Sequence, residues 1–147
     1  MKICVVSSCG GHLTEVRCLR SVYEAFDHFY VLNDKVLLSP DMEGRTVFIT
    51  HAERDWRVAL NFIEALRILY RSRPDVILST GAGPVVPFAI VGRFIFGARI
   101  VFIESMTRIH RPSLTGRILY YVAHDFFYQW EGLRKYFPKG RFGGQLI

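Results

Sequence analysis

Short apolar runs alternate along the chain with longer segments in which apolar residues recur every three or four positions. The short runs are mostly continuous rather than alternating in hydrophobicity, which is typical of strands buried on both faces of a parallel sheet. We therefore predict six strands, at Lys2 to Ser7, His28 to Leu32, Thr46 to Thr50, Asp75 to Ser79, Arg99 to Glu104 and Asp125 to Tyr128.

The longer segments have the period of amphipathic helices. In the second of them a broad apolar stripe forms, while Glu64, Arg67 and Arg71 fall largely on the other side. The alternation of strands and helices predicts an α/β fold with a Rossmann-like, doubly wound parallel sheet. The predicted helices span His12 to Phe26, Trp56 to Arg71, Pro84 to Phe96, Ser113 to Ala123 and Glu131 to Tyr136.

Length and composition limit the fold to one globular domain, residues 1–147. Half of the residues are hydrophobic, which excludes a disordered chain, yet no run reaches the 18 apolar residues of a membrane span. The stretch from Asn33 to Arg45 contains Pro40, Asp41 and Gly44, and we interpret it as a loop within the domain.

The formal net charge is +6, and its basic residues are scattered rather than gathered in one run. Arginine outnumbers lysine, which favours planar partners such as phosphates. No nucleic-acid-binding motif accompanies these residues, so we expect phosphates and a membrane surface as partners, and no nucleic acid.

The three cysteines, Cys4, Cys9 and Cys18, are odd in number and lack C-x-x-C spacing. They predict neither a disulfide framework nor a metal site, and a reducing cytosol is the simplest compartment. Because the first predicted strand begins at Lys2, we expect no leader and no anchor helix. Any membrane association would then be peripheral, at the cytoplasmic face of the cell membrane.

Polar or glycine-rich loops follow four of the predicted strands, beginning at Ser7, Thr80, Glu104 and Gln129. In open parallel sheets, ligands bind outside the carboxyl ends of the strands. The four loops are therefore expected to line one crevice.

The first of these loops places Gly10, Gly11 and His12 before the first predicted helix. Glycines let backbone N–H groups approach a phosphate, and a histidine can accept a proton near neutral pH. The dinucleotide and P-loop fingerprints are both absent. A tight turn with a histidine that caps the helix explains the same residues, so both interpretations stay open.

The second loop consists of Thr80, Gly81, Ala82 and Gly83, followed by Pro84 at a predicted helix start. Two glycine-rich turns that face one crevice can hold a diphosphate. The alternative is a turn that needs glycine for its backbone angles.

Two further groups have both a functional and a structural interpretation. Glu104 ends an apolar strand, where burial raises a carboxyl pKa; it can act as a base or accept a sugar hydroxyl, or it can pair with Arg108 or Arg111. Arg111, Ser113 and Thr115 offer a cation and hydroxyls to an anion near a helix start, or form an ordinary capped helix.

Apolar residues dominate the segment from Pro84 to Phe102, interrupted by Arg93 and Arg99. An interfacial helix with snorkelling arginines has this pattern, and so does a helix of the core.

Taken together, these motifs resemble the PssD type of bacterial polysaccharide biosynthesis protein, along essentially the whole chain. The same family holds the membrane-recruiting subunit of the eukaryotic dolichol-linked N-acetylglucosamine transferase. The resemblance rests on S-S-C-G-G-H-L at 7–13, P-D-V-I-L-S-T-G-A-G at 74–83, I-E-S at 103–105, R-P-S-L-T-G at 111–116, Q-W-E at 129–131 and F-G-G-Q at 142–145.

The resemblance implies the N-terminal half of a GT-B glycosyltransferase, more distantly similar to the acceptor domain of MurG. It implies that this half binds a polyprenyl-diphosphate acceptor, while a separate PssE-type subunit holds the UDP-sugar donor, with no other cofactor and no metal. Gly10, Gly11 and His12 match the first glycine loop, and Gly81, Ala82 and Gly83 match the second. Glu104 matches the glutamate of an H-E-Q-N motif whose last two residues are replaced here by Ser105 and Met106.

Our leading hypothesis is therefore an inverting glycosyltransferase subunit of capsular or exopolysaccharide biosynthesis. In it, His12 deprotonates or orients the acceptor hydroxyl, both glycine loops and Arg111 hold the diphosphate, and Glu104 positions the sugar. A second hypothesis is a non-catalytic scaffold that recruits the donor-binding subunit to the membrane. A third is a nucleotide-binding oxidoreductase domain with Asp34 as the ribose acceptor, which the broken fingerprint disfavours.

Overall fold

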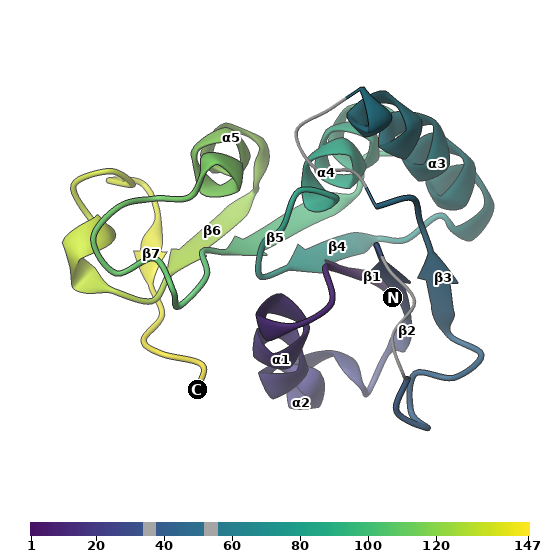
Figure 1. Ribbon diagram of the computed structural model, residues 1–147, viewed down its shortest axis with the longest axis horizontal. Helices are drawn as coiled ribbons and strands as arrows, with labels where there is room; N and C mark the ends of the chain where they lie inside the picture. Colours follow the sequence, from purple (N-terminus) through teal and green to yellow (C-terminus); the bar gives the residue numbers. More distant parts are fainter. Residues whose placement is uncertain (34–37, 52–55) are drawn as a thin grey trace.

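The computed structural model describes residues 1–33, 38–51 and 56–147. In this part of the chain the strands form one parallel sheet in the order β3-β2-β1-β4-β5-β6-β7 (Figure 1). The strands are β1 (Lys2–Ser7), β2 (Asp27–Leu32), β3 (Thr46–Phe48), β4 (Val76–Ser79), β5 (Arg99–Ile103), β6 (Asp125–Tyr128) and β7 (Arg141–Phe142).

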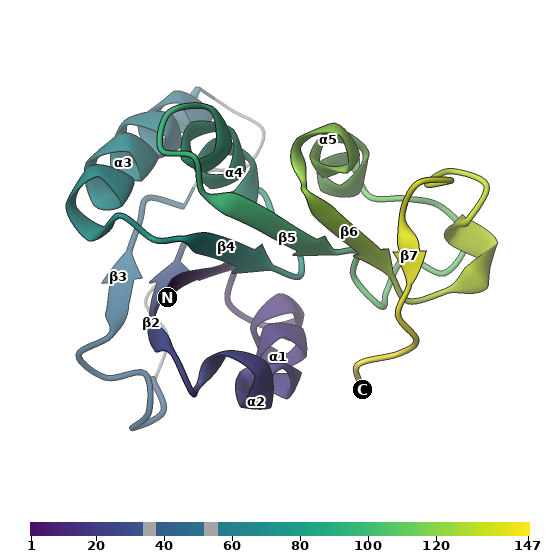
Figure 2. The ribbon, with the colours of Figure 1, turned by 180° about the vertical axis from the view of Figure 1, so that it is seen from behind.

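Helices cover both faces of the sheet, as Figures 1 and 2 show from opposite sides. On one face lie α1 (Gly11–Cys18) and α2 (Arg20–Tyr23). On the other lie α3 (Arg57–Ser72), α4 (Val85–Phe94) and α5 (Leu114–Val122). The predicted fold class, a doubly wound Rossmann-like sheet, is confirmed.

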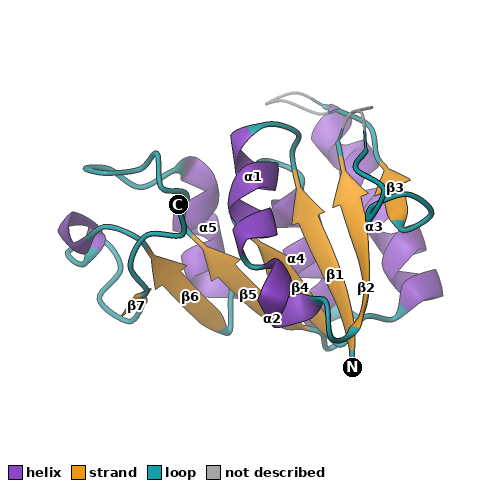
Figure 3. Cartoon of the chain, turned by 90° about the horizontal axis from the view of Figure 1, so that it is seen from below, coloured by secondary structure: helices purple, strands orange, loops and turns teal. Residues whose placement is uncertain are grey.

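The strand order reverses at β1, which pairs with β2 on one side and with β4 on the other. The chain thus leaves β1 toward β2 and β3, and later returns to build the sheet in the opposite direction. At such a switch point the loops after the two central strands separate and leave room for a ligand. In Figure 3 the strands point to one common edge, where these loops lie.

A separate apolar cluster fills the space on each face of the sheet. Phe88, Phe102 and Ile77 belong to the cluster under α3, α4 and α5, and all are fully buried. Tyr23 and Tyr30 belong to the cluster under α1 and α2. The Tyr30 hydroxyl donates to the Tyr23 hydroxyl at 3.3 Å, so even the polar atoms of this second core are paired.

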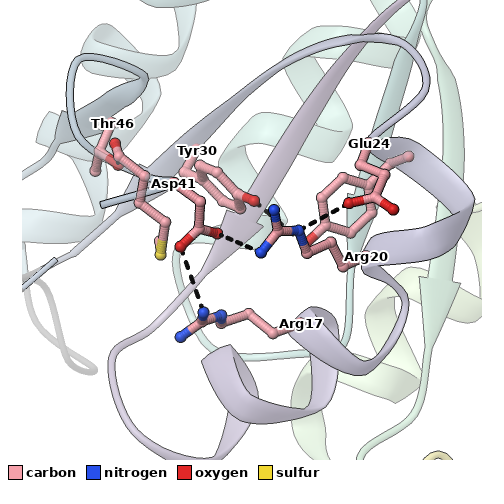
Figure 4. Close-up of polar contacts among 8 residues, drawn as sticks. Arg17, Arg20, Glu24, Tyr30, Asp41 and Thr46 are labelled. Atoms are coloured by element: carbon pink, nitrogen blue, oxygen red, sulfur yellow. Dashed lines mark hydrogen bonds and ion pairs between the residues drawn. The ribbon is translucent and has the colours of Figure 1, made fainter. Parts of the chain in front are cut away.

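The segment before β3 is attached to the first two helices by ion pairs (Figure 4). Asp41 lies 3.5 Å from the Arg17 guanidinium and 3.3 Å from that of Arg20. Arg20 also pairs with Glu24 at 2.9 Å, one helical turn further on. The predicted loop around Asp41 therefore packs against the helices that follow β1, while its residue Asp34 lies outside the described residues.

Some predicted elements differ from the structure. The first predicted helix is divided at Leu19, whose N–H bonds to the Val16 carbonyl while its own carbonyl accepts from Val22 N–H. The predicted helix at Glu131 to Tyr136 is a single 3-10 turn, Glu131–Leu133. The two-residue strand β7 was not predicted, because so short a run has no periodicity to detect.

Candidate functional site

A pocket of about 780 Å³ opens at the carboxyl ends of the strands, beside the switch point of the sheet. Its wall combines the loops after β1, β4 and β5 with the first turns of α4 and α5. Of the predicted site residues, the wall contains His12, Gly81, Ala82, Gly83, Ser113 and Thr115. Gly10, Gly11, Thr80, Glu104 and Arg111 are not part of it.

His12 lies in the first turn of α1, and its ring contacts the second glycine loop. Its Nδ1 is 3.2 Å from the Thr80 carbonyl oxygen, and the Thr80 hydroxyl donates to the His12 carbonyl at 2.8 Å. A carbonyl accepts only from a protonated nitrogen, so in the neutral ring this contact places the proton on Nδ1 and leaves Nε2 as a base. Thr80 thus acts behind the pocket, by holding the histidine.

The second glycine loop has an unusual backbone that brings it against this ring. Gly81 has a φ of 132° and Ala82 a φ of 80°, both in the region that side chains disfavour. The Ser79 hydroxyl stabilises the turn by accepting from Gly81 N–H at 3.1 Å and donating to the Gly81 carbonyl at 3.2 Å. A side chain at position 81 would place its Cβ 2.7 Å from His12 Cε1. Glycine is therefore required here by the histidine as well as by the backbone angle.

Among the described residues, the starts of α1, α4 and α5 contribute to the pocket wall, and Val58 in the first turn of α3 also lines it. His12 belongs to the first turn of α1, Pro84 immediately precedes α4, and Ser113 is the N-terminal cap of α5. Helix N-termini carry partial positive charge and unpaired N–H groups, which favour anions. The guanidinium of Arg108 adds a full positive charge to the same wall. The pocket is suited to a ligand that carries an anionic group such as a diphosphate.

Glu104 is 1% exposed, and its carboxylate lies beneath the start of α5. It accepts from the Ser113 hydroxyl at 2.8 and 3.1 Å, from Ser113 N–H at 3.1 Å and from Ser105 N–H at 3.1 Å. Burial raises the pKa of Glu104, and the hydrogen bonds from Ser113 and Ser105 oppose this rise. Gly116 leaves room for the carboxylate, because a Cβ there would overlap Glu104 Oε2.

These contacts place Glu104 behind the pocket rather than in it. In the described residues the carboxylate forms no ion pair with Arg108 or Arg111, although the charge of Arg108 also opposes the rise of its pKa. Glu104 instead orients Ser113, whose hydroxyl also accepts from Gly116 N–H at 2.8 Å and so caps α5. The predicted cation of the site also changes, because Arg108 lies in the wall and Arg111 does not.

The sequence analysis missed Asn33 and His51, which line the side of the pocket next to β2 and β3. Asn33 Nδ2 lies 3.0 Å from His51 Nδ1, and Asn33 Oδ1 accepts from Cys9 N–H at 3.3 Å. Asn33 directly follows β2. Ligands bind outside the carboxyl ends of the strands in open parallel sheets, and both residues would have been found had this rule been applied to the second and third predicted strands as well.

Beside the pocket, α3, α4 and α5 carry many exposed apolar side chains. Ile63 is 49% exposed and Phe94 69%, and the arginines 67, 71 and 117 lie exposed on the same helices. Leu114 and Ile118 belong both to this surface and to the pocket wall. We call this surface the apolar face; it consists of Trp56, Leu60, Ile63, Leu66, Tyr70, Phe94, Ile95, Leu114, Ile118 and Tyr121.

The apolar face differs from the predicted one. The first part of the segment from Pro84 to Phe102 is core, since Val85 and Phe88 are buried, and its large exposed apolar side chains are Phe94 and Ile95 at the end of α4. On α3, one of the residues predicted to lie on the polar side points toward the protein interior instead. Glu64 turns inward and accepts from Thr50 N–H at 3.0 Å and from Asn61 Nδ2 at 2.8 Å.

Neither a membrane-spanning helix nor a metal-binding cluster is found in the described part of the chain. Its helices are all too short or too polar to cross a bilayer. Its histidine, cysteine and acidic side chains nowhere gather in the groups of three that hold a metal ion.

Comparison with protein families gives a match over residues 42–146 to "Oligosaccharide biosynthesis protein Alg14 like". Among curated proteins, the human "UDP-N-acetylglucosamine transferase subunit ALG14" is 26% identical over all of this chain and 83% of its own length. The subunit of the same name from Saccharomyces cerevisiae is 33% identical over 59% of this chain and 41% of its own length.

Comparison with solved structures shows the fold. The UDP-GlcNAc 2-epimerase of Methanocaldococcus jannaschii superposes with a TM-score of 0.73 at 14% identity, over 95% of this chain and 42% of its own. MurG of Acinetobacter baumannii superposes with a TM-score of 0.70 at 13% identity, over 87% of this chain and 40% of its own. The described sheet and helices match the N-terminal half of a GT-B glycosyltransferase, and this chain spans less than half the length of either enzyme.

Proposed function

Because the chain belongs to the Alg14-like family of oligosaccharide biosynthesis proteins, we propose that it is the acceptor-binding subunit of a two-chain inverting glycosyltransferase. Its substrate is a sugar on a polyprenyl diphosphate, and the complex transfers a second sugar to it from a UDP-sugar. The narrower assignment, to a PssD-type protein of capsular or exopolysaccharide biosynthesis, belongs to the same proposal.

The pocket carries this proposal through one observation: the starts of α1, α4 and α5 contribute to its wall together with Arg108 and the base His12. A diphosphate has the charge that such a site stabilises. The second glycine loop and the positive end of α4 face the diphosphate, together with the hydroxyl of Thr115. Ser113 acts by capping α5, because its hydroxyl proton is donated to Glu104. The first glycine loop acts by setting the start of α1, with Gly10 in a left-handed conformation just before it.

In the proposed reaction, the acceptor hydroxyl attacks the anomeric carbon of the donor as His12 Nε2 takes its proton. The new glycosidic C–O bond forms while the bond to UDP breaks, and UDP leaves with the electron pair. The Thr80 carbonyl holds the ring through Nδ1–H and stabilises the imidazolium that results. Glu104 contributes through Ser113, as a positioning residue.

The lipid part of the acceptor requires a membrane next to the pocket, and the apolar face meets this requirement. It adjoins the pocket through Leu114 and Ile118, and it carries exposed arginines that suit anionic headgroups. We propose peripheral attachment at the cytoplasmic face of the cell membrane through this surface.

We propose that a PssE-type chain supplies the donor site. The human and Saccharomyces cerevisiae relatives are named as subunits of a transferase, which supports a partner of this kind. The pocket opens at the carboxyl edge of the sheet, so a second domain placed over that edge would close it.

Reconstitution of the chain with its donor-binding partner tests the proposal. Transfer from a UDP-sugar to a polyprenyl-diphosphate sugar is expected only with both chains present. His12→Ala should lower kcat at least about a hundredfold, the usual contribution of a general base. The scaffold alternative predicts a different result: His12→Ala and Gly83→Val would leave turnover intact, and only changes in the apolar face would abolish it.

A further inference from the structure

A buried carboxylate, Glu15, lies one turn after His12 on the same helix, and the proposed reaction does not use it. Glu15 is 2% exposed and lines no part of the pocket. Its Oε1 accepts from the Ser105 hydroxyl at 2.7 Å. Its Oε2 accepts from Met106 N–H at 3.3 Å and from Gln129 Nε2 at 3.2 Å. Both oxygens are therefore occupied by groups that follow β5 and β6.

The same contacts reach the C-terminal segment through Gln129. Besides donating to Glu15, Gln129 Nε2 donates to the Glu104 carbonyl at 3.1 Å, and its Oε1 accepts from Leu146 N–H at 2.9 Å. Trp130, the next residue, donates from its indole nitrogen to the Met106 carbonyl at 2.6 Å. One buried group thus joins α1, the loop after β5, the end of β6 and the C-terminal segment.

A buried carboxylate of this kind is an energetically unfavourable way to stabilise a fold. Within residues 1–33, 38–51 and 56–147 no ion pair of Glu15 is found, so neutral dipoles alone compensate the buried carboxylate. Removing a charge from water without a partner cation is unfavourable, and an apolar side chain of similar size would stabilise the fold better. A fully hydrogen-bonded carboxylate instead fixes the relative orientation of the groups that donate to it, because its two oxygens accept hydrogen bonds in preferred directions.

We propose that Glu15 is a positioning residue for the pocket: its carboxylate fixes the first turn of α1, with His12, against the loop after β5, with Ser105 and Arg108. Both elements contribute residues to the pocket wall. Their separation sets how far the base is from a ligand held by Arg108. This inference rests on the proposed function only for its effect on turnover, since the contacts themselves can be tested without a substrate.

The first experiment measures amide hydrogen exchange in the full chain and in Glu15→Gln. The glutamine keeps the shape of the side chain but has one acceptor oxygen and no charge. The bonds from Ser105, Met106 and Gln129 therefore cannot all be kept as they are, and those that remain lose the strength of a charged acceptor. We expect the amides of Met106 and Leu146 to exchange at least tenfold faster, while that of Val5 in β1 keeps its rate. Unchanged exchange at Met106 and Leu146 would overturn the proposal, and so would a uniform increase that includes Val5, which would make Glu15 a contributor to global stability.

The second experiment measures turnover of the complex with the donor-binding chain. Glu15→Gln should lower kcat about tenfold, with the KM for the UDP-sugar unchanged, because misplacement of a base affects the chemical step. Glu43→Gln removes an exposed carboxylate outside the pocket and should change neither constant. Loosened amides with a normal kcat would refute the positioning role. A wild-type complex without transfer activity would count against the proposed function, and the exchange data would then decide on the Glu15 contacts alone.

Discussion

His12 and Thr80 bind each other twice, with the histidine ring donating to the Thr80 carbonyl and the threonine hydroxyl donating to the His12 carbonyl. The two residues are far apart in sequence and come from the two loops on either side of the sheet's switch point. The position of the base therefore depends on the shape of the second glycine loop.

Gly81→Ala should separate the two residues of this pair. The new Cβ would lie 2.7 Å from His12 Cε1, so the ring has to turn away from Thr80. We expect kcat of the reconstituted complex to fall at least about tenfold, since a displaced base loses its geometry. Gly97→Ala is the control for an alanine at a positive φ: its φ of 70° lies in the left-handed region, where the strain is about 1–2 kcal/mol, and nothing lies within 4 Å of its Cβ. Equal turnover in both variants would contradict the role of Gly81.

Gly116→Ala should destabilise the protein. Its Cβ would overlap Glu104 Oε2 and approach the Ser113 hydroxyl to 3.0 Å, which disturbs the cap of α5. The expected loss is about 1–3 kcal/mol in the free energy of unfolding, measured with urea. At Gly143 an added Cβ meets only Phe127 at 3.7 Å, an ordinary contact, so Gly143→Ala should stay within about 0.5 kcal/mol of the wild type.

The raised pKa of Glu104 predicts a pH dependence of stability. The folded protein binds this proton more tightly than the unfolded chain, so the stabilising contribution is complete below the unfolded value near 4.5. It is lost as the pH rises through the folded pKa. The free energy of unfolding of the wild type minus that of Glu104→Gln should therefore decrease from pH 4 toward neutral pH and then level off.

Asp125 provides a control of opposite sign. The hydrogen bond from Arg99 and the charges of Arg99 and Arg141 hold the pKa of Asp125 below its usual value. Its contribution is present above the unfolded pKa and is lost as the pH falls through the folded one. The difference between the wild type and Asp125→Asn should thus grow as the pH rises through the acid range. Parallel curves for the two variants would contradict the assignment of Glu104.

Changes in the apolar face should weaken membrane binding without unfolding the protein. Ile63→Asp and Phe94→Asp replace exposed side chains on α3 and α4. Each variant should bind anionic vesicles about tenfold more weakly in a sedimentation assay, from lost apolar burial and from charge repulsion. Val22→Asp, at a residue that is 62% exposed on the opposite face of the sheet, should bind like the wild type. Equal losses in all three would indicate attachment that does not use this face.

The strands were the most predictable part of the fold, because continuous apolar runs have few alternatives once they alternate with helical periods. The predicted bounds of β1 and β6 agree with the structure at both ends. The helices were less predictable. A break such as that at Leu19 leaves no mark in the hydrophobic pattern, since the chain on both sides remains apolar on one face.

The position of the pocket was predictable, because ligands bind at the carboxyl ends of parallel strands, but the roles of the individual residues were not. Glu104 and Thr80 follow their strands as the rule requires, yet both side chains turn behind the wall. The direction of a side chain at a strand end depends on partners far along the chain, such as Ser113 for Glu104. For the same reason the polar pattern of α3 gave a wrong prediction for Glu64, because hydrogen bonds from Thr50 and Asn61 stabilise the inward orientation of its side chain.

The central position of β1 in the sheet also affects the order in which the strands pair while the chain is synthesised. β1 is made before the other strands and pairs with β2 after the crossover through α1 and α2, whereas its other edge stays open until β4 has been made. An open strand edge on a nascent chain invites pairing with other chains, and parallel pairings of distant segments form slowly. Protection of the open edge by chaperones during this interval is therefore expected to determine the yield of the protein. The pocket, whose wall needs the loops after both β1 and β4, exists only once this interval has passed.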